Sequence, residues 1–128
     1  MSLKNYSNKS LGQKGEIIIK NILQDKGCEI VDSNVQIGNI GEIDIIAKKD
    51  GVFRFIEVKT IACQKEKEVE GLPFYNINRK KLKTMGRLAT LWIAKREIDE
   101  LYQLDAAALV YITSTDKWMY KFIENISW

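Results

Sequence analysis

The spacing of hydrophobic residues along the chain predicts two helices. Between 10 and 26 apolar residues recur three and four positions apart, which predicts a helix that Ser10 caps and Gly27 ends. A second helix is expected over 77–96 for the same reason. The apolar face of this second helix consists of Leu82, Met85, Leu88, Ala89, Trp92 and Ile93.

Shorter runs rich in branched and aromatic residues predict strands between and after the helices. Asp50 and Gly51 separate two of these runs and are typical of the turn of a β-hairpin. The segment 61–76 has mixed charge and holds the only proline, so we expect a long, mobile loop there. The expected strands are 28–37, 41–48, 52–60, 104–113 and 118–125.

The resulting order, α-β-β-β-α-β-β, is typical of the α/β or α+β class, with a mixed β-sheet flanked by helices. A length of 128 residues favours a single domain, 1–128, that can bury a core of its own. No apolar run approaches the length of a membrane span, and the first ten residues lack the hydrophobic region of a signal peptide. We therefore expect a cytoplasmic protein that does not contact the membrane.

The amino-acid composition excludes several kinds of chemistry. The chain has no histidine, and its two cysteines, Cys28 and Cys63, are far apart in the sequence, so a zinc site is not expected. Histidine-based acid–base or nucleophilic catalysis is excluded for the same reason. Any catalysis must use carboxylates, lysines, hydroxyls or a hard metal ion.

The predicted hairpin, "GEIDIIAKKDGVFRFIEVKT", carries charged residues where strands are usually apolar. With the turn at Asp50–Gly51, a continuous ladder would place Asp44 opposite Glu57 and Glu42 opposite Lys59, all on one face. The reverse face would carry Ile43, Ile45, Ala47, Ile56 and Val58.

This arrangement puts three acids and one lysine close together, which is unfavourable without a further positive charge. Magnesium would offset the excess charge, because it is a hard ion that takes carboxylate oxygens and keeps several waters. The alternative is a cross-strand salt bridge of Lys59 with Glu42 or Glu57, with Asp44 left in solvent.

A second concentration of charge lies at the start of the second predicted helix. The segment "NINRKKLKTMGR" holds Arg79, Lys80, Lys81, Lys83 and Arg87 and no acid. Such a patch can bind phosphates, although a helix face in solvent is the commoner role of clustered lysines.

Together, the acid on one strand, the acid–x–lysine on the next and the glutamate on the first helix resemble the PD-(D/E)XK nuclease superfamily. More narrowly, four blocks in order resemble the YraN family, a bacterial group predicted to be endonuclease-like and similar to archaeal Holliday junction resolvases. The blocks are "GQKGE" (12–16), "GEIDIIA" (41–47), "FIEVKT" (55–60) and the basic helix start (77–85). The chain departs from the family at Ile61–Ala62, where an arginine is common, and at Leu104–Asp105, where an aromatic–Asp pair is common.

The resemblance implies a role for each matching residue. Asp44 and Glu57 would hold the metal, Lys59 would be the partner of the attacking water, and Glu16 would be a further acid from the first helix. Glu42 matches the family's Gly-Glu-Ile-Asp block, and Lys81 falls where the family tends to keep a lysine. As alternatives, Glu16 would only complement the dipole of its helix, and Lys81 would be one solvated lysine among several.

These residues support the hypothesis of an endonuclease that hydrolyses phosphodiester bonds in branched or structured DNA with Mg²⁺ or Mn²⁺. The carbonyl of Val58 would be a third metal ligand. Backbone contacts would come from the 61–76 loop and from Arg79, Lys80, Lys81 and Lys83. One alternative is a nucleic-acid-binding protein that keeps the fold without catalysis, and another is an ion site that only stabilises the domain. A homodimer would suit a junction with two-fold symmetry.

Overall fold

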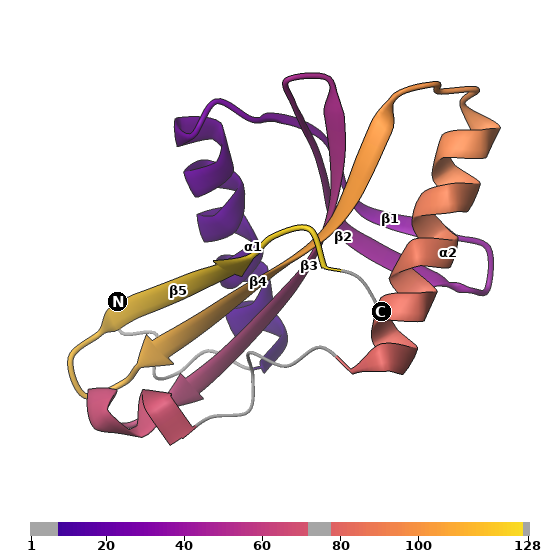
Figure 1. Cartoon of the computed structure of the whole chain (residues 1–128). Helices are drawn as coiled ribbons and strands as arrows, with labels where there is room; N and C mark the ends of the chain where they lie inside the picture. Colours follow the sequence, from indigo (N-terminus) through magenta and orange to yellow (C-terminus); the bar gives the residue numbers. More distant parts are fainter. Residues whose placement is uncertain (1–7, 72–77, 127–128) are drawn as a thin grey trace.

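The computed structural model describes residues 8–71 and 78–126 of the chain (Figure 1). The predicted order of elements is confirmed, and so is the mixed sheet flanked by helices; the 3₁₀ helix η2 is an addition. In chain order the elements are α1 (Asn8–Asp25), β1 (Glu29–Ile37), β2 (Gly41–Lys49), β3 (Val52–Cys63), η2 (Glu66–Gly71), α2 (Arg79–Lys95), β4 (Leu101–Ile112) and β5 (Lys117–Ile123).

The five strands form one sheet in the order β1-β2-β3-β4-β5. All neighbouring strands are antiparallel except β3 and β4, which are parallel because α2 connects them and returns the chain to the same end of the sheet. Figure 1 shows α1 and α2 on opposite sides of the sheet. The molecule therefore has three layers, with the sheet in the middle.

Each helix covers its own hydrophobic cluster on the sheet. On the α1 side, Ile19 and Leu23 pack against Ile45, Ala47 and other strand residues. On the α2 side, the predicted apolar stripe of the helix is confirmed, and the buried cluster there consists of Ile43, Ile46, Phe53, Phe55, Leu82, Met85, Leu88, Ala89, Trp92 and Leu104.

Helix boundaries confirm some of the predicted signals and contradict others. Gly27, with φ of +87°, follows the end of α1 as expected. The prediction that Ser10 caps α1 is wrong, because the helix already includes Asn8. At the start of α2, Oδ1 of Asn78 accepts a hydrogen bond of 2.8 Å from the N–H of Lys81 and caps the helix.

The predicted loop 61–76 is shorter than expected. Residues 61–63 continue β3, because they pair in register with β4 as far as Ile112, and residues 66–71 form η2. Val69 of η2 packs against β4 and is buried. Residues 72–76 of the predicted loop lie outside the described part of the chain.

Candidate active site

The sheet opens between β2 and β3, and the candidate site lies at this opening. The two strands pair in the predicted register from Lys49–Val52 to Ile45–Ile56 and no further. Beyond that point β2 and β3 diverge, as Figure 1 shows below the crossing of the strands. The expected ladder that would pair Asp44 with Glu57 is therefore wrong, since the strands have already separated there.

The side chain of Asp44 replaces the missing ladder. Its Oδ2 accepts a hydrogen bond of 2.8 Å from the backbone N–H of Val58 on β3. This N–H would otherwise be left without a partner when β2 turns away, which costs free energy in a half-buried position. Asp44 therefore lies in the gap between the strands instead of projecting from one regular face of the sheet.

The side chains of β2 on either side of Asp44 point to opposite faces of the sheet. Ile43 packs in the cluster under α2, whereas Ile45 packs in the cluster under α1. The prediction that both residues share one face is wrong. On the neighbouring strand β1, Asn34 lies between the residues that pair with Ile43 and Ile45, and its φ of +52° is in the left-handed region.

The carboxyl groups of Asp44 and Glu57 nevertheless come together, as the sequence predicted. They lie within hydrogen-bonding distance of each other. Burial, and next the negative charge of Asp44, raises the pKa of Glu57 from 4.5 to about 7. Burial also raises the pKa of Asp44, and the hydrogen bond from Val58 opposes this change. The pair is therefore short of positive charge.

The positive charge nearest to the pair comes from α2. The Nζ of Lys81 lies 3.3 Å from Oε1 of Glu57. Its charge lowers the pKa of both carboxyl groups, but burial outweighs this effect. The salt bridge of Lys59 with Glu57 or Glu42, which was the alternative to a metal site, does not form, and Lys59 is exposed with no ion pair among the described residues. The lysine that contacts Glu57 is thus Lys81 of α2 and not the predicted Lys59 of β3.

Glu16 reaches the same opening from α1. Burial, and next the charge of Asp44, raises the pKa of Glu16. With its amide nitrogen turned to the acids, Asn34 donates to Oε2 of Glu16 at 3.1 Å and to Oε1 of Glu42 at 2.9 Å. Because Asp44 lies in the gap, groups from both faces of the sheet approach it: Glu16 from one side and Lys81 from the other.

A glycine brings α1 close enough for this contact. A Cβ at Gly15 would lie 2.1 Å from Oγ1 of Thr60 on β3, which is closer than atoms can pack. The "GQKGE" block thus combines the close approach at Gly15 with the acid at Glu16 in the next position.

The sequence signals differ for the residues of this site. Asp44, Glu57 and Glu16 were candidates from the sequence, and the structure brings them together. Asn34 was missed, and its only local signal is that asparagine tolerates a positive φ more readily than most residues. The remaining predicted residues, Glu42, Lys59, Arg79, Lys80 and Lys83, are exposed around the opening or along α2.

The donor set fits a hard divalent cation. Asp44 and Glu57 offer carboxylate oxygens. Mg²⁺ is usually bound by one or two carboxylates, with waters and substrate phosphates as its other ligands. No group of three or more acidic or cysteine side chains is gathered as a metal site within the described residues. A two-carboxylate set therefore matches Mg²⁺ or Mn²⁺ better than an ion that needs a full protein cage.

Asp105 lies apart from this set, at a position where the chain departs from the YraN pattern. It is 2% exposed, and its Oδ1 accepts hydrogen bonds from the N–H of Asn125 at 2.8 Å and from Nε2 of Gln103 at 2.9 Å. Asp105 thus fastens the segment after β5 to β4.

Comparison with known proteins assigns the chain to a family. The family model described as "Uncharacterised protein family UPF0102" matches residues 15–110, which include the whole of the opening. The chain belongs to the UPF0102 family. A UPF0102 protein of Campylobacter lari is 36% identical over 128 residues, and one of Campylobacter fetus is 34% identical over 127 residues; the matches cover 100% and 99% of both chains. A UPF0102 protein of Alkaliphilus metalliredigens is 36% identical over 80% of this chain and 87% of its own.

Two further observations concern the cysteines and the helices of this UPF0102 protein. Cys28 and Cys63 both carry free thiols. No helix within residues 8–71 and 78–126 has the length and apolar character needed to cross a membrane.

Proposed function

We propose that this UPF0102 protein is a metal-dependent endonuclease of the PD-(D/E)XK type that hydrolyses phosphodiester bonds in branched or structured DNA. The observation that carries the proposal is the pairing of Asp44 and Glu57, two carboxyl groups held together at an opening of the sheet. Such a pair is unfavourable for stability unless a cation offsets it, so a functional role explains it better than a structural one.

Asp44 and Glu57 would hold Mg²⁺ or Mn²⁺, with the carbonyl of Val58 as a further ligand. When bound, the ion acidifies a water molecule and offsets negative charge in the transition state of phosphodiester hydrolysis. The hydrogen bond from the N–H of Val58 fixes Asp44 at 2.8 Å and so orients one carboxylate before any ligand arrives.

Lysines would supply the remaining positive charge. Lys59, exposed two residues beyond Glu57, is free of ion pairs with described residues and can orient the water and contact the scissile phosphate. Lys81 neutralises Glu57 in the metal-free chain, at 3.3 Å, and becomes available for a phosphate once a divalent cation takes over that role. Glu16 and Glu42, held by Asn34, would bind a second ion or waters around the first.

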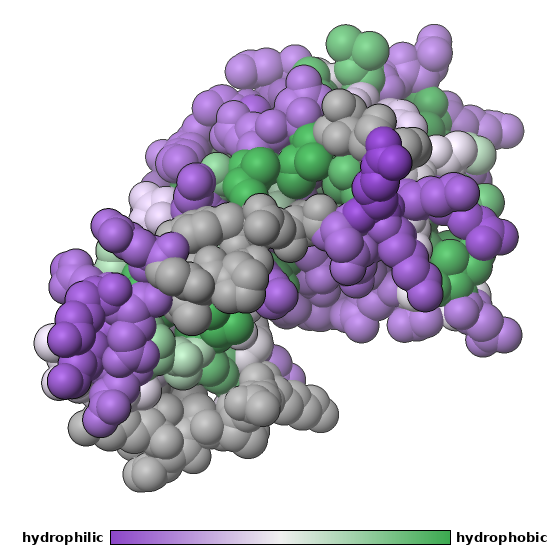
Figure 2. All heavy atoms as spheres, turned by 60° about the horizontal axis from the view of Figure 1, so that its bottom comes forward, coloured by the Kyte–Doolittle hydropathy of each residue, from purple (hydrophilic) through white to green (hydrophobic). Residues whose placement is uncertain are grey.

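The start of α2 would bind the DNA backbone. Arg79, Lys80, Lys81 and Lys83 lie in its first turns, and none of the residues in the first turn is acidic. The positive end of the helix dipole adds to these charges, so this end attracts phosphates without reading the base sequence. Figure 2, which turns the lower end of Figure 1 toward the viewer, shows a mainly hydrophilic surface with hydrophobic patches between.

The test is cleavage of branched, nicked and single-stranded DNA with Mg²⁺, with Mn²⁺ and with EDTA. We expect cleavage that requires the metal and is lost in Asp44→Ala, Glu57→Ala and Lys59→Ala. Glu70→Ala, which removes an exposed acid of η2, is the matched control and should cleave like the wild type. Cleavage that survives all three substitutions at the site would refute the assignment.

A second candidate function is binding of nucleic acid without catalysis. The salt bridge from Lys81 to Glu57 favours it, because this bridge already supplies one positive charge to the pair without a metal. This alternative predicts salt-dependent DNA binding that is the same in EDTA and in Mn²⁺, with no cleavage. A homodimer on a symmetric junction stays a prediction that sedimentation of the DNA complex would test.

A further inference from the structure

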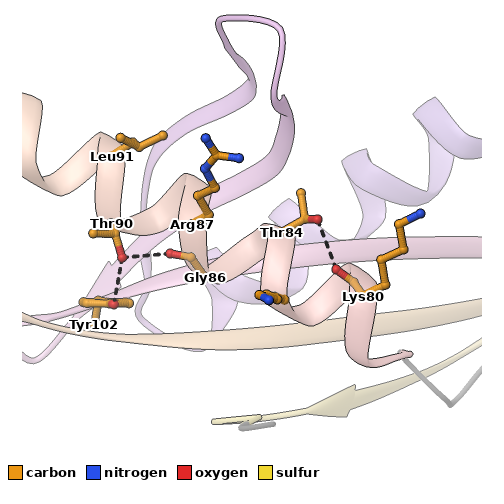
Figure 3. A pocket seen from close by; sticks show the side chains of 8 residues that line it. Lys80, Thr84, Gly86, Arg87, Thr90, Leu91 and Tyr102 are labelled. Atoms are coloured by element: carbon orange, nitrogen blue, oxygen red, sulfur yellow. Dashed lines mark hydrogen bonds between the residues drawn. The ribbon is translucent and has the colours of Figure 1, made fainter.

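A groove along α2 is separate from the acid pair and has its own chemistry. Its volume is about 640 Å³, and it lies between the helix and the first residues of β4 (Figure 3). Lys80, Lys83 and Arg87 line it, and none of the lining residues is acidic. The three cations are spaced three and four residues apart, so they lie along one face of the helix.

An exposed aromatic ring lies toward the other end of the groove. Tyr102 is 43% exposed although it is large and hydrophobic, and Leu91 beside it in the groove is 39% exposed. An exposed ring next to basic side chains is the combination that binds unpaired bases, because every base has a flat face that stacks on an aromatic ring.

The ring of Tyr102 is held in place before any ligand binds. Oγ1 of Thr90 donates to the carbonyl of Gly86 at 2.9 Å, so the hydroxyl of Tyr102 is the donor to Oγ1 of Thr90 at 3.3 Å (Figure 3). The ring also packs against Phe55 edge to face, with centroids 5.8 Å apart. A ring that is fixed in this way loses little conformational freedom when a base stacks on it.

One end of the groove lies at the same end of α2 as the lysine that contacts the acid pair. Lys80 at one end adjoins Lys81, whose ammonium contacts Glu57. From Lys80 to Leu91 the helix rises about 16 Å, which is long enough to bind a short stretch of a single strand.

We propose that this groove binds a single-stranded segment of DNA, with its phosphates against Lys80, Lys83 and Arg87 and one base stacked on Tyr102. Duplex DNA is not the ligand, because its bases are already stacked on one another and cannot reach the ring. The inference deepens the proposed function and rests on it at one step, namely that the bound strand continues to Asp44 and Glu57. The groove would then select substrates with an unpaired segment, such as a flap or an open junction.

Binding is tested on the full chain in EDTA, where no cleavage occurs, by fluorescence anisotropy of a labelled oligothymidylate. Tyr102→Leu should weaken binding by at least about 5-fold, because stacking of one base contributes about 1–3 kcal/mol. Tyr102→Phe keeps the ring and should bind nearly as the wild type does. A blunt duplex of the same length should compete weakly, and so should polyglutamate, which carries charge but no bases.

The charges are tested by the dependence of binding on salt. Each of Lys80→Gln, Lys83→Gln and Arg87→Gln should reduce the slope of log affinity against log salt by about 0.7. Lys95→Gln removes the same charge from the other end of α2 and should leave the slope unchanged.

Any of three results would overturn the inference. The first is wild-type affinity of the Tyr102→Leu protein for the single strand. The second is a duplex that competes as well as the single strand, and the third is polyglutamate that competes as well as the single strand. Its failure can be told apart from failure of the proposed function. Binding that depends on Tyr102 in a protein that never cleaves DNA leaves the groove assigned and removes the nuclease. If cleavage requires Asp44 but binding does not depend on Tyr102, the nuclease is supported and the proposed role of the groove is refuted.

Discussion

Replacement of Glu57 by glutamine should change how the stability of the metal-free protein depends on pH. Glu57 has a pKa of about 7 in the folded chain against 4.5 in an unfolded chain. Between these values the folded protein holds a proton that the unfolded chain releases, so the group stabilises the fold most below pH 4.5. This stabilisation is lost as the pH rises through 7.

The size of the effect follows from the same two values. Each pH unit in the window contributes about 1.4 kcal/mol, so Glu57 accounts for about 3 kcal/mol of unfolding free energy between pH 4.5 and pH 7. Only 21% of its side-chain surface is exposed, so screening by water removes a small part of this amount. Glutamine keeps the shape and cannot ionise. As the pH rises from 4.5 to 7.5, the unfolding free energy of Glu57→Gln should therefore increase by about 3 kcal/mol relative to that of the wild type.

Urea unfolding in EDTA at several pH values, followed by circular dichroism, measures this difference. The matched control is Glu29→Gln, the same chemical change at an exposed position on β1. The reasoning is refuted if Glu57→Gln and Glu29→Gln give the same dependence on pH. A difference that has the opposite sign would mean that Glu57 is stabilised as a carboxylate, and the pair would not be short of positive charge.

Three other substitutions probe the surroundings of the pair. Lys81→Gln removes the cation 3.3 Å from Glu57 and should raise the pKa of Glu57 further, as carbon NMR of the carboxyl group would show. Gly15→Ala should destabilise the fold by about 1–3 kcal/mol in urea unfolding, because its Cβ would meet Oγ1 of Thr60 at 2.1 Å; adding Thr60→Ala should restore part of this loss. Asn34→Ala places a residue that disfavours positive φ at φ of +52° and should lower the unfolding free energy by about 1–2 kcal/mol. Asn34→Gly should keep the backbone conformation and lose only the amide contacts.

The hairpin shows why much of this fold was predictable from the sequence. Asp50 and Gly51 both take positive φ, of 51° and 76°, as the predicted tight turn requires. A turn of fixed length sets the register, so the pairing of Lys49 with Val52 and of Ile45 with Ile56 followed directly. The helices were predictable because their apolar stripes are regular.

The place where the hairpin opens was not predictable in the same way. Pairing of β2 with β3 ends at Ile45 and Ile56, where Asp44 instead accepts a hydrogen bond from Val58, and no residue pattern within the hairpin marks this point. The contact of Lys81 with Glu57 joins elements 24 positions apart in the sequence. Local pattern therefore identified the acids that gather, Asp44, Glu57 and Glu16, whereas tertiary packing placed Lys81 against Glu57.

Titration calorimetry of Mn²⁺ into the protein is the most direct test of the claim that Asp44 and Glu57 form a metal site. We expect one clear binding event in the wild type, its loss in Asp44→Asn and in Glu57→Gln, and its retention in Glu29→Gln. Equal Mn²⁺ binding by the wild type and by the double variant Asp44→Asn/Glu57→Gln would contradict the account.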